Sequence, residues 1–81
     1  MILEMKVTEA GMTSLSIGEV IRMQKGLESL EGVSKVEPLN VHICRSRVEI
    51  CAGEVWKVMA FIREQSRGYI EVRKIQNGKK L

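Results

Sequence analysis

The chain has 81 residues, of which 44% are hydrophobic and 28% are charged. A chain of this length forms one modest domain with a single core, and this composition is far from that of a disordered chain. Its uncharged stretches are much shorter than the roughly 18 apolar residues of a membrane helix, and no basic region followed by an apolar run opens it. The net charge is +3, and the basic excess lies largely at the end, in Arg73, Lys74, Lys79 and Lys80.

Residues 2–8 alternate between apolar and polar side chains, with Leu3, Met5 and Val7 on one face. This period of two is typical of a half-buried strand. Residues 9–15 contain a glycine and hydroxyl side chains, so we expect a loop there.

The first helix is expected to begin after Ser16, because Glu19 follows at the spacing of a capping box. Leu15 and the residue at position 20 occupy the positions of a hydrophobic staple, which supports the same start. Gly32 favours a left-handed stop after the helix. Apolar residues recur between these ends at spacings of three and four, in a stripe of Val20, Met23, Leu27 and Leu30 that Ile17 and Ile21 widen.

Residues 35–44 and 47–51 are rich in β-branched side chains, and only Arg45 and Ser46 need to separate them. These two segments are therefore predicted to form an antiparallel hairpin. Pro38 has no backbone N–H to donate, so we expect the first of these strands at a sheet edge or with a bulge near its start.

A second helix is predicted over residues 54–66, with Gly53 as a weak cap and Gly68 as its stop. Residues 69–75 alternate again and predict a last strand. The apolar stripe of the second helix consists of Val55, Val58, Met59 and Ile62.

The predicted order of elements is βαββαβ. Each helix has one apolar stripe and each strand one apolar face, which is satisfied when both helices cover one side of a four-stranded antiparallel sheet. The fold class is thus α+β, a ferredoxin-like sandwich with the first and third strands central. Residues 1–76 are expected to form this single domain and residues 77–81 a basic polar tail. The uncovered sheet face is predicted to carry Glu4, Lys6, His42, Cys44, Arg47, Glu49, Cys51, Tyr69, Glu71 and Arg73.

A two-residue turn would place Cys44 and Cys51 on the same sheet face but four residues of strand apart, on the order of 13 Å. That separation is too long for a disulfide bond or a shared zinc ion. We therefore expect two reduced cysteines that fill space, no metal site, no cofactor and a cytoplasmic location.

His42, Cys44 and Glu49 cluster in this register, and a histidine beside a glutamate is a pair that performs proton chemistry in enzymes. A cross-strand polar pair explains the same residues equally well. With one histidine and no aspartate, the chain offers no catalytic triad or carboxylate pair. We expect a protein that is not an enzyme and keep these three residues as candidate ligand contacts, with a surface completed by a partner subunit left open.

Thr13, Ser14 and Ser16 lead into the N-terminus of the first helix, where free N–H groups favour an anion or a polar ligand. These three hydroxyl residues are the main ligand-binding candidates. The alternative is that Ser16 only caps the helix and the other hydroxyls face solvent.

Trp56 lies off the apolar stripe of its helix and is expected to be partly exposed, either at an interface or over the rim between helix and sheet. Tyr69 is the only aromatic residue predicted on the open sheet face and is the second interface candidate. Nucleic-acid binding is not expected, because stacking platforms need several aromatic rings.

Three segments, residues 13–16, 27–31 and 48–58, give the chain a resemblance to the small thiamine-binding, YkoF-like proteins. They match the hydroxyl-rich entry to the first helix, its Leu-Glu-Ser-Leu-Glu end, and the family's order of strand, glycine and helix. The chain departs from that family at residues 45–47, where Arg-Ser-Arg replaces Met-Gly-Thr. The resemblance implies a ferredoxin-like fold, association through the sheets into dimers or tetramers, and a pyrimidine-type ligand held before the first helix and across a subunit contact.

Residues 11–13 and 30–36 are also similar to heavy-metal-associated domains. Ser14 and Ile17 stand where that family has paired thiolates, so copper transport is not expected.

The resulting hypothesis is a non-enzymatic, cytoplasmic homo-oligomer that associates through its sheet face and binds a small heteroaromatic ligand, with no membrane partner. One alternative is a protein–protein adaptor that uses Trp56 and its helix. Another is a regulatory amino-acid-binding domain of the same topology.

Overall fold

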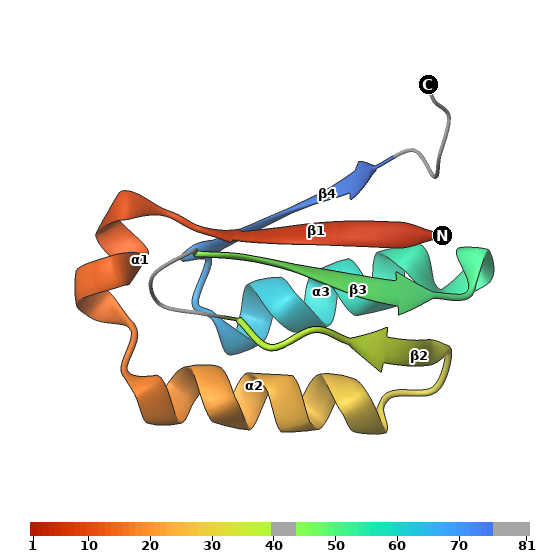
Figure 1. Cartoon of the computed structure of the whole chain (residues 1–81), viewed down its shortest axis with the longest axis horizontal. Coiled ribbons are helices and arrows are strands. Elements are labelled where there is room, and N and C mark those ends of the chain that lie inside the picture. The colour runs from red at the N-terminus through yellow and green to blue at the C-terminus, as the bar shows by residue number, and fades with distance from the viewer. Residues whose placement is uncertain (40–43, 76–81) are drawn as a thin grey trace.

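The computed structural model describes residues 1–39 and 44–75, which form one four-stranded sheet and its helices (Figure 1). The elements are, in chain order, β1 (Ile2–Val7), α1 (Glu9–Ser14), α2 (Ile17–Ser29), β2 (Val33–Val36), β3 (Arg45–Ile50), the 3-10 helix η1 (Ala52–Glu54), α3 (Val55–Gln65) and β4 (Ile70–Ile75).

All neighbouring strands pair antiparallel in the order β2-β3-β1-β4, so the first and third strands are central, and the ferredoxin-like prediction is confirmed. Figure 1 shows α2 and α3 on one side of the sheet and α1 beyond the end of β1. The apolar faces of the strands and helices meet between the two layers. The core consists of Leu3, Met5, Val7, Met23, Leu27, Val48, Ile50, Val55, Val58, Ile62 and Ile70.

The start of α2 is also confirmed, because Ser16 and Glu19 form both hydrogen bonds of the capping box. The loop that we expected over residues 9–15 is wrong, since most of this segment is α1. Thr8 caps α1: its Oγ1 accepts a hydrogen bond from the N–H of Gly11 at 3.0 Å. The N–H and the hydroxyl of Thr8 both donate to the carbonyl of Tyr69, which ties the start of α1 to the start of β4.

The predicted two-residue turn at Arg45 and Ser46 is wrong, because both residues belong to β3. Val36 ends β2 and pairs with Val48. The buried Ser46 hydroxyl donates to the carbonyl of Glu37, so a polar residue on the covered face of β3 is satisfied by the chain that follows β2. The strands therefore pair in another register, although Arg47 and Glu49 of β3 are exposed opposite the buried face, as predicted.

The first strand of this pair, β2, does lie at a sheet edge as Pro38 led us to expect. A register shift interrupts its pairing between Val33 and Lys35.

The predicted tail, residues 77–81, lies outside the described residues. No helix in the described part of the chain is long and apolar enough to span a membrane.

Candidate functional site

An apolar pocket of about 100 Å³ lies where α1, the start of α2 and the end of β1 meet. We call it the α1–α2 pocket. The buried backbone of α1 at Gly11 forms part of its wall, and the two staple residues of α2 line it as well. Its lining residues are Val7, Gly11, Met12, Leu15, Val20, Leu39 and Cys44.

The predicted ligand-binding hydroxyls lie at the junction of α1 and α2, next to this pocket but not in its lining. Thr13 Oγ1 donates to the carbonyl of Ala10 at 3.1 Å. Ser16 Oγ accepts from the N–H of Glu19 at 3.1 Å and so caps α2. The side chain of Ser14 is exposed. Two of the three hydroxyls thus hold helix ends in place, and the pocket beside them has apolar walls.

Arg67, in the turn before β4, contacts both the end of α1 and the first turn of α2. Its Nη2 donates to the carbonyl of Ser14 at 2.9 Å and lies 3.1 Å from Glu19 Oε2. The N–H of Ser16, which donates to Glu19, and the nearby Arg67 guanidinium lower the pKa of Glu19 below its ordinary value of 4.5. A carboxylate thus already occupies the N-terminus of α2, the position where an anionic ligand was expected.

The lowered pKa of Glu19 predicts a pH-dependent contribution to stability. A carboxyl whose pKa is lower in the folded state stabilises the protein above pH 4.5, and this stabilisation is lost as the pH falls through the folded-state pKa. Glu19→Gln keeps an acceptor for Ser16 but removes the charge. We expect this variant to melt below the wild type at neutral pH and together with it in acid, as measured by circular dichroism.

Glu28→Gln is the matched control, because Glu28 is exposed on the same helix. It should melt like the wild type across the same pH range. A difference between Glu19→Gln and the wild type that persists unchanged in acid would contradict the role of the ionised carboxylate.

Two members of the second predicted cluster, Cys44 and Glu49, do not lie on the same face. Cys44 is half-buried and packs against the core beside the α1–α2 pocket, whereas Glu49 is exposed on the uncovered face. Because β3 extends from Arg45 to Ile50, Cys44 lies before the start of the strand and Glu49 lies near its other end. His42 lies outside the described residues. Cys51 is exposed just after the end of β3.

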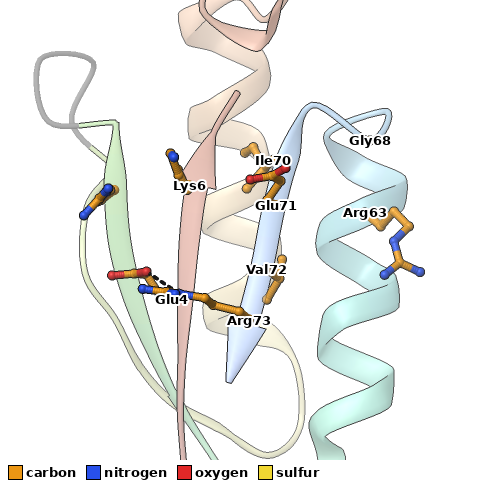
Figure 2. Close-up of a pocket in the computed structure, with 9 residues that line it drawn as sticks. Glu4, Lys6, Arg63, Gly68, Ile70, Glu71, Val72 and Arg73 are labelled. Carbon is orange, nitrogen blue, oxygen red and sulfur yellow. Dashed lines mark hydrogen bonds and ion pairs between the residues drawn. The ribbon is translucent and has the colours of Figure 1, made fainter. Parts of the chain in front are cut away.

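A charged hollow of about 560 Å³ lies along β4, and sequence reasoning missed it. Figure 2 shows Glu4 and Arg73 meeting across the strands, where Arg73 Nε donates to Glu4 Oε1 at 2.8 Å. Lys6 pairs with Glu71 in the next row of the sheet. We call this the β4 hollow, and it is lined by Glu4, Lys6, Arg45, Arg63, Gly68, Ile70, Glu71, Val72 and Arg73.

The two predicted interface residues lie at opposite ends of β4. Trp56 is 75% exposed, as its position off the stripe predicted, and Lys74 Nζ lies 5.5 Å from the centre of its ring. Tyr69 is half-buried before β4, with the Arg67 guanidinium 5.4 Å from its ring centre. Each aromatic ring thus makes a cation–π contact, Trp56 with Lys74 and Tyr69 with Arg67.

No protein-family model matches the chain, and no curated protein or solved structure is significantly similar to it.

Proposed function

We propose that this chain is a non-enzymatic, cytoplasmic binding protein that takes a single heteroaromatic ring of pyrimidine type in the α1–α2 pocket and acts as a homo-oligomer. The pocket is the observation that carries this proposal. Ligand sites are mostly apolar concavities with a few polar groups at their margin. The α1–α2 pocket has apolar walls, and Thr13, Ser14 and Ser16 are the chain neighbours of its lining residues Met12 and Leu15.

The size of the pocket supports a small ring. A dry cavity of about 150 Å³ binds benzene. About 100 Å³ that is open to the surface accommodates most of one six-membered ring and leaves its substituents outside. A two-ring compound such as thiamine would then extend beyond one copy, which agrees with a ligand shared across a subunit contact. The resemblance to thiamine-binding proteins supplies the ligand class.

The uncovered sheet face supports the homo-oligomer. No helix of the described chain packs against that face, since the covered face takes both α2 and α3. Charges alternate across its middle row, from Arg47 through Glu4 to Arg73. A face of alternating charges is complementary to a second copy turned about a two-fold axis along the strands, because Glu4 then meets the partner's Arg47.

Ligand binding is tested by a thermal-shift panel of thiamine, its pyrimidine precursor, nucleotides and amino acids. At a ligand concentration about a hundredfold above Kd, we expect the pyrimidine compounds to raise the midpoint by about 10 °C. Val20→Phe fills the pocket and should abolish the rise. Ile21→Phe changes the neighbouring residue, which is exposed and does not line the pocket, and should preserve it.

A protein–protein adaptor is the second candidate function, and the 75% exposure of Trp56 favours it. The same panel separates the candidates. A shift with amino acids alone favours a regulatory domain, and no shift with any compound would contradict the ligand proposal and favour the adaptor.

A further inference from the structure

The two edges of the sheet differ in how well they are protected against pairing. The β2 edge is only four residues long, has a register shift, and is followed by Pro38. Such features discourage the addition of another strand. The β4 edge is six residues long and pairs with β1 in continuous register. Among the described strands, none lies on the outer side of β4. The β4 edge is therefore the longer and more regular of the two.

The hydrogen bonds of β1 show which backbone groups of β4 point outward. The N–H of Thr8 donates to the carbonyl of Tyr69 at 3.0 Å, which makes these two opposite residues a hydrogen-bonded pair. Bonded and non-bonded pairs alternate along an antiparallel ladder. Glu71 and Arg73 thus direct their backbone groups toward β1. Val72 and Lys74 direct theirs outward, as does the carbonyl of Ile70.

We propose that two copies of this chain pair antiparallel along β4, about a two-fold axis at Val72, and so form one continuous eight-stranded sheet. In this register Val72 forms both backbone hydrogen bonds with the partner's Val72, as the outward direction of its N–H and carbonyl requires. On the uncovered face Glu71 lies opposite the partner's Arg73, and Arg73 lies opposite the partner's Glu71. The contact is isologous, as a two-fold dimer requires.

Charge selects this register over its neighbours. A two-fold axis one residue earlier would place Glu71 opposite the partner's Glu71. An axis one residue later would place Arg73 opposite the partner's Arg73. Like charges directly opposite each other destabilise a strand pair, whereas opposite charges stabilise it. Glu71 and Arg73 are both exposed on the same strand face. Arg73 bonds Glu4 through Nε, and its two Nη groups take no part in that bond.

The outer surface of α3 extends the same contact. Trp56, Ala60 and Arg63 are exposed at spacings of four and three, so they share one side of the helix. That side faces β4, because Lys74 lies over Trp56 and Arg63 lines the β4 hollow together with Val72. Trp56 lies beside the end of β4 and Arg63 beside its start. The two-fold axis therefore brings Trp56 toward the partner's Arg63, where a cation–π contact forms.

Edge pairing is separate from the ligand proposal and from the contact through the sheet face, because it leaves both the α1–α2 pocket and that face uncovered. In the register about Val72, the charges of this edge are complementary to those of a second copy. The occupant of this edge is thus a second copy of the chain.

The test is sedimentation of Glu71→Arg and Arg73→Glu, each alone and mixed in equal amounts. Each variant alone places like charges opposite each other twice, and its dimer should dissociate about tenfold more readily than the wild-type dimer. In the mixture, the arginine introduced in one chain faces the glutamate introduced in the other, and the unchanged Arg73 of the first chain faces the unchanged Glu71 of the second. We expect the mixture to recover wild-type association. A substitution can also remove contacts within its own chain, as Arg73→Glu removes the hydrogen bond to Glu4. Such a loss is present both when the variant is alone and when it is mixed, so it does not affect the comparison between the two.

Two further measurements separate edge pairing from other outcomes. Trp56→Ala should weaken the dimer, and the emission of this single tryptophan should move to shorter wavelength as the wild type associates. Arg47→Glu, on β3, should leave edge pairing unchanged. A monomeric wild type, or a mixture no tighter than its components, would overturn the proposal. So would a dimer that only Arg47→Glu disrupts, which instead supports association through the sheet face. A missing thermal shift with pyrimidines bears only on the ligand proposal.

Discussion

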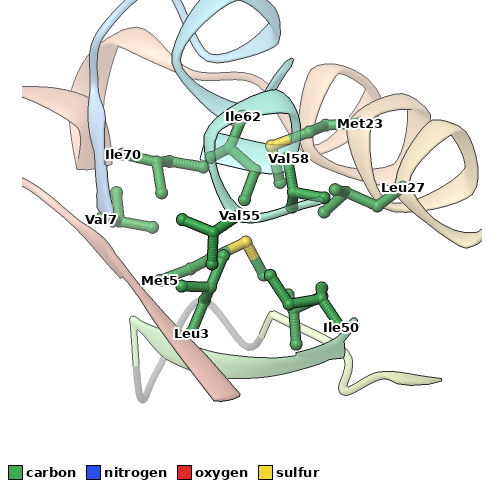
Figure 3. Packing of buried hydrophobic residues seen from close by; sticks show 11 residues of the cluster. Leu3, Met5, Val7, Met23, Leu27, Ile50, Val55, Val58, Ile62 and Ile70 are labelled. Carbon is green, nitrogen blue, oxygen red and sulfur yellow. The ribbon is translucent and has the colours of Figure 1, made fainter. Parts of the chain in front are cut away.

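Replacement of Leu27 by alanine is expected to lower the free energy of unfolding by about 3 kcal/mol. Leu27 is fully buried, and Figure 3 shows it reaching with Met23 from α2 toward Val58 of α3. Truncation removes buried apolar surface and leaves a cavity that the surrounding residues fill only in part. A domain of this size has roughly 4 to 12 kcal/mol of total stability, so the loss is a large fraction of it.

The matched control for Leu27→Ala is Ile17→Ala in the same helix. Ile17 is 67% exposed, so its truncation should change stability by less than about 0.5 kcal/mol. Chemical denaturation followed by circular dichroism measures both variants. Equal losses in the two would contradict the assignment of Leu27 to the core and of Ile17 to the surface.

This pair of residues also marks how far periodicity predicts burial. The spacing of apolar residues correctly gave the direction of the α2 stripe, since Met23 and Leu27 are buried. It also included Ile17 and Ile21, which are exposed. The width of a buried stripe depends on what the helix packs against, and α2 contacts β2 and α3 along one side only. The sequence of α2 alone does not show which elements it packs against, so it does not predict how wide the buried stripe is.

Local signals gave the four strands, the helices α2 and α3 and the capping box of α2, because each depends on residues a few positions apart, but they missed α1. The two hairpin strands do pair antiparallel, but their register differs from the one that a two-residue turn at Arg45 and Ser46 would give. In the observed register Cys44 packs against the core and not on the uncovered face, and Arg45, which was predicted in the turn, lies in β3. The predicted cluster of Cys44 and Glu49 was lost with it.

To predict the β4 hollow, one needs to know which residues of the first and last strands lie side by side. Glu4 and Arg73 meet although they are 69 positions apart in the sequence, and nothing in either segment alone predicts the contact. The alternation in both strands predicted which residues face outward. Given the predicted pairing of the first and last strands, a test of opposite charges in each register would have been the available signal.

Replacement of Gly11 by alanine is expected to destabilise the protein by about 2 kcal/mol. A Cβ at this position would lie 2.8 Å from the carbonyl oxygen of Tyr69 and 3.0 Å from Val7 Cγ1. The first of these atoms belongs to the backbone and cannot rotate away, so α1 must move away from β4. The wall of the α1–α2 pocket moves with it. We therefore expect Gly11→Ala to lose the thermal shift with pyrimidine compounds as well as stability.

Gly18→Ala is the control that makes this prediction sharp, because it is the same substitution in the neighbouring helix. A Cβ at Gly18 meets only Ser16 Oγ, at 3.9 Å. Alanine is a better helix former than glycine by up to about 1 kcal/mol, so Gly18→Ala should leave stability unchanged or raise it. Opposite signs at the two glycines identify close packing of α1, and not helix propensity, as the cause at Gly11. A neutral or stabilising Gly11→Ala would mean that α1 does not press against the start of β4, and the pocket between α1 and α2 would then lose its rigid wall.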